Sequence, residues 1–364
     1  MNSAVHHIVF RTDANHQIGT GHFMRCLTFA DGLKKSNSHI RFISRYLPEY
    51  LQEMLVEKGY ECILINTKRN NMPLDELAHS NWLGVNQKQD AEDTVQALSD
   101  LKWDWLIVDH YALDAEWETE IKQVAAHVFV IDDIADRHHE CDVLLDQNYY
   151  KNMDIRYTGK VPENCQLLLG PKYALLRDEF KRLHKKTSPR NGSVKKLLIF
   201  FGGVDADNYT SRIVKLLSDL NVSDMQVDVV IGSKHPYGTE IIEACKNRNF
   251  FCHVQTTNMA GLMASADLSI GGAGSTTWER CCLGLPALTF SLADNQTEIA
   301  LGLETLGAGK YVNLFKYDSD KKLYKVIFDF LNNRDEISKL SRNAYSIVDG
   351  MGVERVCDVV LPVL

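Results

Sequence analysis

From residue 8 to residue 27 the sequence reads IVFRTDANHQIGTGHFMRCL. Its first residues are β-branched or aromatic and predict a strand, whereas apolar residues at helical spacing predict a helix over residues 23–33. A loop that contains Gly19 and Gly21 joins the two. A strand, a glycine loop and a helix in this order are typical of an α/β fold.

The same alternation of short apolar runs and amphipathic segments continues along the chain. Strands that are buried on both faces and separated by helices predict parallel sheets. Two such series predict two doubly wound, Rossmann-like α/β domains that face each other across a cleft. The further expected strands are residues 40–43, 62–65, 105–108 and 128–131 in the first series and residues 196–201, 226–231, 252–254, 268–270 and 287–290 in the second.

A polar segment with Pro and Gly, residues 185–193, separates the two series. We therefore expect an N-terminal domain over residues 1–186 and a C-terminal domain over residues 187–364. Residues 173–184 are expected to form a helix that leaves the first domain, and the chain after about residue 320 to form a helical tail of the second. Ligands of such folds bind at the carboxyl ends of the strands.

Composition excludes several classes of function. With 364 residues, 45% of them hydrophobic and 24% charged, the chain is typical of a globular protein. A net charge of −8 argues against a nucleic-acid partner, and the apolar runs are shorter than a membrane helix requires. Nine scattered cysteines and an N-terminus without a secretory signal indicate reduced thiols and a cytoplasmic location. The oligomeric state is left open.

The first glycine loop lacks the full dinucleotide-binding fingerprint. Gly19 and Gly21 allow backbone N–H groups to approach a phosphate, and we expect both to contact the substrate. The fingerprint needs a third glycine, at the position of Met24, and an acidic residue after the second strand, which this sequence does not have. The glycine-lysine motif that binds nucleoside triphosphates is also absent from the sequence. We therefore expect no cofactor.

Ionisable residues surround this loop. His22 lies at the first turn of the expected helix, where the helix dipole favours a neutral imidazole that can accept a proton from water. We expect His22 to be the general base, Asp13 to orient it, and Arg25 to neutralise phosphate or brace the loop. The alternative is that His22 only caps the helix and that Arg25 pairs with Asp13. The loop by itself does not decide between these interpretations.

The second glycine-rich turn gives a stronger signal. Residues 268–280 read LSIGGAGSTTWER, a strand that ends in three glycines and three hydroxyl side chains before a helix. Backbone amides around Gly274, with Ser275 and Thr276, are expected to hold a diphosphate without a metal. Glu279, one turn into the helix, is expected to accept the ribose hydroxyls. The alternative is a turn needed only for close strand–helix contact, with Glu279 in a salt bridge.

Neighbouring strand ends in the second half support a nucleotide site. Three residues after one strand are expected to offer main-chain groups to a uracil edge, and two amides after another are expected to bind sugar hydroxyl or acetamido groups. A glycine pair after the first strand of this half lets the chain approach a ligand. These candidates are, in the same order, Asn258, Met259 and Ala260; Asn295 and Gln296; and Gly202 and Gly203.

Other candidates lie in the first half. Tyr111 follows an expected strand and is a candidate for a catalytic contact with the substrate, although a buried hydroxyl bonded locally is the alternative. Arg177 is expected to brace the cleft beside the substrate. The tryptophans are expected in the core. Residues 132–142 are rich in Asp, Glu, His and Cys, but their spacing matches no standard zinc site, so we expect a solvated, self-paired loop and no metal.

Taken together, these motifs resemble a known family, the UDP-2,4-diacetamido-2,4,6-trideoxy-β-L-altropyranose hydrolases of pseudaminic acid biosynthesis. The resemblance runs from residue 11 to about residue 298. It rests on the stretches Arg11-x-Asp13, Gly21-His22-x-Met24-Arg25-Cys26-Leu27, Val108-Asp109-His110-Tyr111, Ile131-Asp132-Asp133, Leu145-Asp146-Gln147-Asn148, Gly170-Pro171-x-Tyr173-Ala174-Leu175-Leu176-Arg177, Phe201-Gly202-Gly203 and Gly274-Ser275-Thr276-Thr277-Trp278-Glu279-Arg280.

The resemblance implies a fold and a set of roles. The family is similar to inverting glycosyltransferases of the GT-B fold, with water in place of the sugar acceptor. It implies that His22 is the general base, that Glu279 contacts the nucleotide, and that Asn295 and Gln296 face the sugar. This chain departs from compact family members in a longer tail and in residues 70–89, which look like a loose insertion.

The sequence therefore predicts a metal-independent UDP-sugar hydrolase. Water attacks the anomeric carbon with inversion and UDP leaves; the expected catalytic residues are His22, Asp13 and Tyr111. Its expected partner is a small UDP-sugar, with no nucleic acid and no membrane. Three alternatives remain: a GT-B glycosyltransferase, a UDP-sugar 2-epimerase acting on a related UDP-amino-sugar, and a non-catalytic UDP-sugar binding module.

Overall fold

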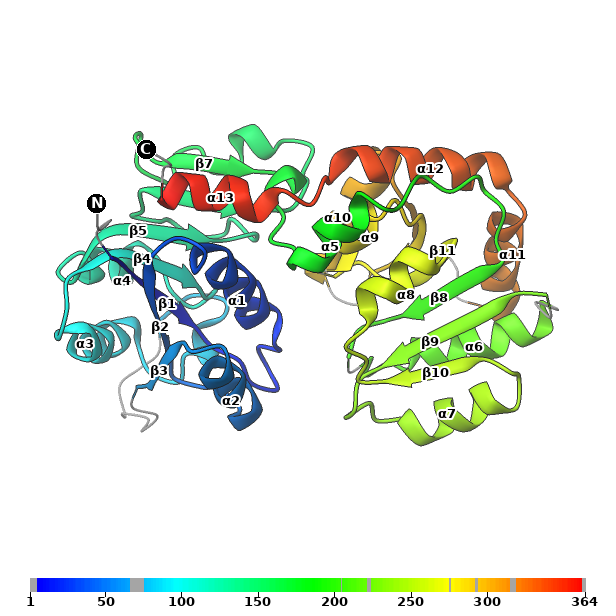
Figure 1. Ribbon diagram of the computed structural model, residues 1–364, viewed down its shortest axis with the longest axis horizontal. Helices are drawn as coiled ribbons and strands as arrows, with labels where there is room; N and C mark the ends of the chain where they lie inside the picture. Colours follow the sequence, from blue (N-terminus) through cyan, green and yellow to red (C-terminus); the bar gives the residue numbers. More distant parts are fainter. Residues whose placement is uncertain are drawn as a thin grey trace. The chain divides into compact units, whose positions relative to one another are not determined.

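The computed structural model describes residues 5–65, 75–203, 205–220, 224–274, 276–291, 294–314 and 319–361. The chain divides into two compact units, each built around one sheet (Figure 1). Unit 1 comprises Met1–Asn148, Asn152–Leu175 and Gly352–Leu364, and unit 2 comprises Tyr149–Lys151 and Leu176–Met351. None of the described helices is long and apolar enough to cross a membrane.

Within the described residues, the sheet of unit 1 has seven parallel strands in the order β3-β2-β1-β4-β5-β6-β7. The inner strand β1 pairs through Ile8 with Ile40 of β2 on one side and with Trp105 of β4 on the other. The strands are β1 His6–Thr12, β2 Ser38–Ser44, β3 Glu61–Leu64, β4 Trp103–Asp109, β5 Ala125–Ile131, β6 Val143–Asp146 and β7 Gln166–Leu169. The helices are α1 Gly21–Leu33, α2 Glu49–Glu57, η1 Ser80–Trp82, α3 Gln87–Leu98, α4 Ala115–Ile121, η2 Met153–Ile155, η3 Pro171–Tyr173 and α13 Gly352–Val360.

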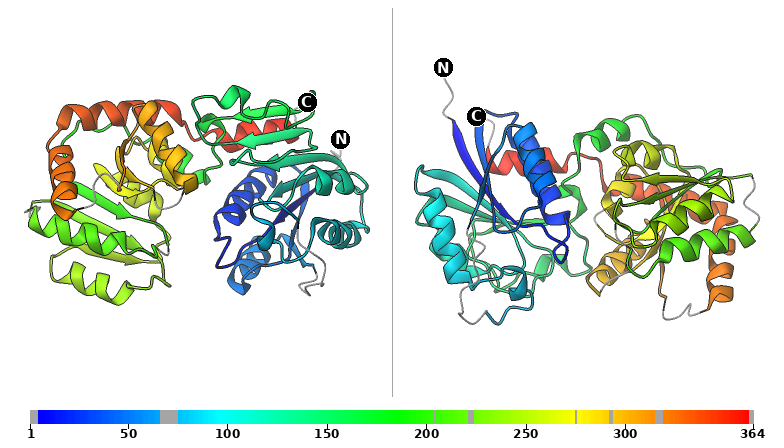
Figure 2. Two further views of the ribbon diagram at one scale, coloured as in Figure 1. Left: turned by 180° about the vertical axis from the view of Figure 1, so that it is seen from behind. Right: turned by 90° about the horizontal axis from the view of Figure 1, so that it is seen from below.

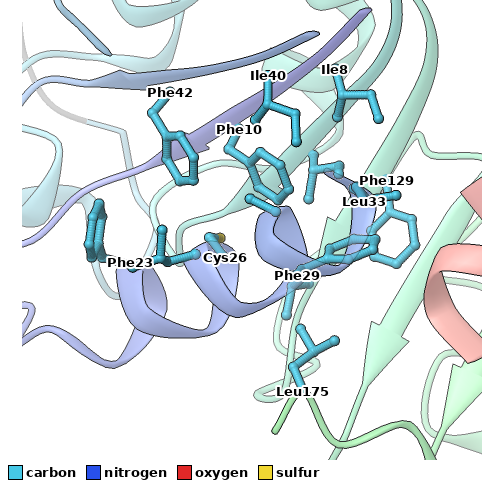
Figure 3. Packing of buried hydrophobic residues seen from close by; sticks show 14 of the residues in the cluster. Ile8, Phe10, Phe23, Cys26, Phe29, Leu33, Ile40, Phe42, Phe129 and Leu175 are labelled. Atoms are coloured by element: carbon cyan, nitrogen blue, oxygen red, sulfur yellow. The ribbon is translucent and has the colours of Figure 1, made fainter. Parts of the chain in front are cut away.

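Helices cover both faces of this sheet, which is why its central strands are apolar throughout. On one face, α1 contributes Phe29, which packs against Phe10 of β1 and Phe129 of β5 (Figure 3). The helix α13 packs on the same side, in contact with α1. On the other face, α3 and α4 bury Leu98 and Trp117.

Unit 2 repeats this plan. Over its described part, the sheet has six parallel strands in the order β10-β9-β8-β11-β12-β13, and one face of the sheet forms a core with α6, α7, α11 and α12 (Figures 1 and 2). The strands are β8 Lys196–Phe200, β9 Gln226–Ile231, β10 Phe251–Val254, β11 Leu268–Gly272, β12 Ala287–Phe290 and β13 Lys310–Val312. The helices are α5 Asp178–His184, α6 Tyr209–Asp219, α7 Gly238–Lys246, α8 Met259–Ser265, α9 Thr276–Cys282, α10 Asp294–Thr305, α11 Asp320–Leu331 and α12 Arg334–Ile347.

The strand order of each sheet fixes where a ligand site can form. In unit 1 the order reverses between the neighbours β1 and β4, and in unit 2 between β8 and β11. At such a reversal the loops leave the carboxyl ends of two adjacent strands toward opposite faces of the sheet, which opens a crevice. The first glycine loop follows β1, and the second follows β11.

The predicted fold class is confirmed, since both units are doubly wound and Rossmann-like. Three short strands, β6, β7 and β13, escaped the prediction. The expected helix over residues 173–184 is two pieces, η3 and α5, separated by residues 174–177.

The compact units also divide elsewhere than at residue 186. The tail was assigned to the second domain, but α13 lies in unit 1 because Val353, Val356 and Val360 are buried in the core beside α1. Close contact there requires Gly32, where an added Cβ would lie 2.4 Å from Val353. On the other side of the expected boundary, α5 belongs to unit 2.

Candidate active site

The first candidate site is an imidazole–carboxylate pair at the reversal point of unit 1. His22 is the second residue of α1, and Asp109 is the last residue of β4. Nδ1 of His22 lies 2.5 Å from Oδ1 of Asp109. Because an ionised carboxylate only accepts hydrogen bonds, Nδ1 is the donor, and Nε2 is left as the acceptor of the ring. Among the described residues Nε2 has no hydrogen-bond partner.

Arg25, one turn further along α1, holds the carboxylate from the other side. Its guanidinium donates to both oxygens of Asp109, at 2.5 Å and 2.8 Å, and to Oδ2 of Asp133 at 2.8 Å. Burial by itself raises the pKa of Asp109, but the charge of Arg25 and the hydrogen bonds from Arg25 and His22 outweigh it and hold this pKa well below its usual range. Asp109 is therefore a fixed negative charge beside the imidazole.

Tyr111 completes this group. Its ring lies edge-on to the His22 ring, with 4.6 Å between the centroids. Its hydroxyl donates to Oδ1 of Asp133, and Asn148 donates to the other oxygen of the same carboxylate at 3.2 Å. The proton of Tyr111 is thus directed to Asp133, and the lone pairs of its oxygen remain for another donor.

Asp13 does not orient His22, contrary to the prediction. Its oxygens accept from the Arg11 guanidinium at 2.7 Å and 3.2 Å and from the backbone N–H of Arg45 at 2.7 Å. Burial raises the pKa of Asp13, but Arg11 and His110 hold it well below its usual range. Asp13 therefore belongs to a fully buried ion-pair network beneath the loop. The alternative pairing of Arg25 with Asp13 is wrong as well, because Arg25 pairs with Asp109 and Asp133.

The two loop glycines differ in what their surroundings require. Gly19 has φ +76°, a left-handed conformation that side chains resist. Gly21 has no such backbone, and an added Cβ there would meet nothing within 4 Å. Nothing in the described chain therefore requires glycine at position 21, whereas the backbone of Gly19 does require it.

The segment 132–142 is self-paired as predicted but only partly solvated, since Asp132, Arg137 and His139 are buried while Asp136 and His138 are exposed. Arg137 donates to Asp132 at 2.8 Å, and His139 lies 2.7 Å from Glu118. Burial lowers the pKa of His139, but Glu118 and Asp132 outweigh it and raise the value to about 9. Among the described residues no group of His, Cys, Asp and Glu is arranged to hold a metal ion.

The second candidate site is the turn between β11 and α9 in unit 2. An added Cβ at Gly271 would lie 2.0 Å from the carbonyl oxygen of Phe200, so this glycine is required by strand packing. At Gly274 the nearest atom would be Nε2 of Gln296, 3.9 Å away. Close strand–helix contact therefore explains the first glycine of the turn but not the third. Thr276 begins α9, and Ser275 lies outside the described residues.

Glu279 lies one turn into α9 and has a raised pKa. Burial raises its pKa to about 7 from an ordinary value of 4.5, although the nearby Arg177 opposes the rise. Nη2 of Arg177 lies 3.5 Å from Oε1 of Glu279, and both residues belong to unit 2. Arg280 donates to the carbonyl of Gly272 at 2.9 Å and so braces the turn from behind.

Replacement of Glu279 by glutamine is expected to stabilise the ligand-free protein at pH 8 but not at pH 4.5. The folded state keeps the Glu279 proton up to about pH 7, whereas the unfolded chain releases it near 4.5. The folded state therefore binds more protons in this window, and its free energy of unfolding falls as the pH rises, by about 3 kcal/mol at most. Glutamine does not titrate, so the variant does not lose this stability as the pH rises.

The melting temperature of Glu279→Gln, measured against pH, checks this expectation. The exposed Glu298, on α10 of the same unit, provides the control Glu298→Gln. Equal melting temperatures for Glu279→Gln and the unmodified protein at pH 8 would contradict the raised pKa.

The remaining predicted ligand contacts are distributed over neighbouring strand ends of unit 2. Asn258 precedes α8, and Met259 and Ala260 form its first turn, with the Ala260 side chain buried. Gln296 lies in α10 near Gly274; the side chain of Asn295 is outside the described set. Gly202 has φ +101°, and Gly203 faces open space without such a backbone.

Sequence reasoning missed two carboxylates. Asp109 and Asp133 were each noted as part of a motif that carries the resemblance, and Asp133 also as part of a charged segment, but neither was given a role. Asp109 ends β4, which pairs with β1. Asp133 follows β5, which lies one strand beyond β4 in the sheet. Their position at a strand end was the available signal, but the pairing with His22 and Arg25 depends on strand order, which the motif does not encode.

Comparisons with known proteins agree with this fold. Residues 197–351 match the glycosyltransferase family 28 C-terminal domain. The UDP-2,4-diacetamido-2,4,6-trideoxy-beta-L-altropyranose hydrolase of Campylobacter jejuni is 26% identical over 302 residues, which cover 82% of this chain and 97% of the relative. The resemblance predicted from the motifs is thereby confirmed.

Two further similarities bear on the fold. An uncharacterized protein of Methanocaldococcus jannaschii is 24% identical over 299 residues; the match covers 80% of this chain but only 57% of that longer protein. The crystal structure of MurG from Acinetobacter baumannii superposes with a TM-score of 0.68 at 15% identity, covering 99% of this chain and 100% of MurG. The chain therefore has the two Rossmann-like domains of the GT-B glycosyltransferase fold, with a glycosyltransferase-like C-terminal domain over residues 197–351.

Proposed function

We propose that this chain hydrolyses UDP-2,4-diacetamido-2,4,6-trideoxy-β-L-altropyranose to UDP and the free diacetamido sugar, as a step of pseudaminic acid biosynthesis. The Campylobacter jejuni relative of that name supports the substrate. The observation that supports the reaction type is the pair of His22 and Asp109, in which a buried carboxylate leaves Nε2 of the imidazole as a proton acceptor.

In the proposed reaction His22 acts as general base. The oxygen of a water molecule forms a bond to the anomeric carbon while the bond from that carbon to the diphosphate oxygen breaks, with inversion. The water proton passes to Nε2, and UDP leaves with the electron pair of the broken bond. Asp109 stabilises the imidazolium that forms, and Tyr111, whose proton is directed to Asp133, offers its oxygen as a second acceptor to the attacking water.

In this proposal unit 2 binds the nucleotide. The diphosphate contacts the backbone amides of Gly274 and Thr276, with Ser275, and Glu279 contacts the ribose. Gly202, Gly203 and the turn at Asn258 line the rest of the nucleotide, and Asn295 and Gln296 face the acetamido groups. Fixed donors at the diphosphate stabilise the charge that grows on the leaving group, which typically contributes several kcal/mol.

The space beside the Cα of Gly274 allows a test of nucleotide binding. Gly274→Ala is expected to weaken UDP binding about tenfold or more while the melting temperature stays near its original value, because the new methyl group meets no atom of the described residues closer than 3.9 Å. Gly271→Ala is the matched comparison and is expected to lower the melting temperature. Calorimetric titration with UDP measures the affinity; unchanged affinity in Gly274→Ala would place the diphosphate elsewhere.

A panel of UDP-amino-sugars tests the reaction itself. Incubation in oxygen-18 water, followed by NMR of the first-formed anomer, is expected to give free sugar that carries the label at the anomeric carbon with inverted configuration. Label in UDP would indicate attack at phosphorus and contradict the mechanism. A sugar product formed only with an added acceptor would favour a glycosyltransferase, a 2-epimeric product would favour an epimerase, and binding without turnover would favour a binding module.

A further inference from the structure

Two aromatic side chains outside the predicted site pack against it. The Trp82 ring stacks on Tyr111 at 5.4 Å between centroids and lies edge-on to His22 at 5.9 Å. His79 contacts both Trp82, at 4.6 Å, and Tyr111, at 5.3 Å. We call His79 and Trp82 the aromatic wall. Trp82 was expected in the core, but both wall residues are half-buried.

The wall is anchored to the core of unit 1. Trp82 ends η1, and the next residues bury Leu83 and Val85 beside α3 and α4. Between them Gly84 has φ +75°, and an added Cβ would lie 2.2 Å from the hydroxyl of Tyr46. Within the described part of the expected loose insertion, residues 75–89, the stretch 83–87 is therefore packed into unit 1, which corrects the prediction there, whereas Glu76, Ala78, Asn81 and Lys88 are exposed; residues 70–74 lie outside the described set.

Together with the ion pairs, the wall leaves little of the imidazole accessible. Asp109 and Arg25 contact Nδ1 of His22, and the rings of Tyr111 and Trp82 lie against the imidazole. The His22 side chain keeps 10% of its surface exposed. This small exposed area is the part of the ring that a water molecule can reach.

We propose that the aromatic wall is a specificity element that admits water to His22 and excludes alcohol acceptors. The inference rests on the proposed function, since transfer and hydrolysis differ only in the attacking group. In transfer, the oxygen of R–OH would bond to the anomeric carbon, its proton would pass to Nε2, and UDP would leave as in hydrolysis. Trp82 takes no part in these bonds and is a positioning residue.

The first test is partition between water and alcohols. The unmodified protein, assayed with a UDP-amino-sugar in methanol, ethanol and glycerol, is expected to give free sugar, with glycoside falling as the alcohol grows. Trp82→Ala is expected to raise the glycoside-to-sugar ratio about tenfold or more, the scale of a lost pocket contact, and to remove the dependence on alcohol size. Trp82→Phe, which keeps an aromatic ring, is expected to restore both the low glycoside-to-sugar ratio and its dependence on alcohol size. An unchanged ratio in Trp82→Ala across the series would overturn the proposal.

The second test does not need turnover. Diethylpyrocarbonate modifies neutral imidazoles, and peptide mass spectrometry gives the rate at His22 relative to the exposed His16 in the same chain. Trp82→Ala is expected to raise this relative rate about tenfold, whereas Tyr50→Ala, which truncates an aromatic ring that is 51% exposed on α2, leaves it unchanged.

The two tests separate two failures. If His22 is modified at the same relative rate in Trp82→Ala and in the unmodified protein, the proposed role of the aromatic wall is overturned, even if UDP-sugars are hydrolysed. A raised rate in a protein that hydrolyses no UDP-sugar overturns the proposed function and leaves the enclosure of His22 standing.

Discussion

Replacement of His22 by alanine is expected to lower kcat for UDP-sugar hydrolysis about 10³-fold while UDP binding is retained. The imidazole is the group proposed to accept the water proton, and methyl cannot. The binding contacts proposed for UDP all lie in unit 2, whereas His22 lies in unit 1. Steady-state kinetics and calorimetric titration with UDP measure the two effects on one preparation.

The control for this variant is His16→Ala, because His16 is an exposed histidine of the same loop. It is expected to leave kcat unchanged. Turnover by His22→Ala at a rate close to that of the unmodified protein would remove the proposed base and leave only the nucleotide-binding proposal.

Replacement of Asp109 by asparagine is expected to lower kcat about 10²- to 10⁴-fold, through His22. A carboxylate only accepts from Nδ1, but an amide can donate to it and so favour the tautomer with the proton on Nε2. An imidazole in that tautomer cannot accept a proton from water at Nε2. The rate and the melting temperature are measured together, since Asp109→Asn also leaves the buried Arg25 with one carboxylate fewer.

Asp133→Asn separates the tautomer from the loss of charge. This variant also removes a carboxylate partner of Arg25, but it leaves the contact of His22 with Asp109 in place. A smaller loss of kcat in Asp133→Asn than in Asp109→Asn is expected. Equal losses would mean that the carboxylates around Arg25 and Tyr111, and not the tautomer of His22, determine the rate.

Much of the fold followed from local patterns in the sequence. Every expected strand exists, because each is a short segment rich in apolar residues that is visible without its neighbours, and this includes the partly exposed edge strands β3 and β10. The strands β6 and β7 escaped because each contains an apolar run of only three residues, Val143–Leu145 and Leu167–Leu169. The helix α13 was placed with the wrong unit because an amphipathic pattern shows that a helix has a partner but not which partner.

The candidate site was predictable only in part, because local patterns do not show which distant segments come together. His22 and Arg25 are one helical turn apart, and their neighbourhood follows from helix geometry. Asp109 is separated from His22 by 87 residues, so its contact depends on β4 lying beside β1. Asp13 is close in sequence to His22 and was therefore the expected partner. In the structure its carboxylate is bonded instead to Arg11, two residues away.

The return of α13 to unit 1 has a consequence for how this protein is made. Residues 1–175 leave the ribosome with the α1 side of their core still lacking three buried valines, whose burial is worth roughly 1.5–2 kcal/mol each. That sum is a large share of the 5–15 kcal/mol by which a domain is usually stable. The first half of the chain can therefore reach its full stability only after the second half has been synthesised. Shortened products that end before residue 352 should be prime substrates for cellular proteases.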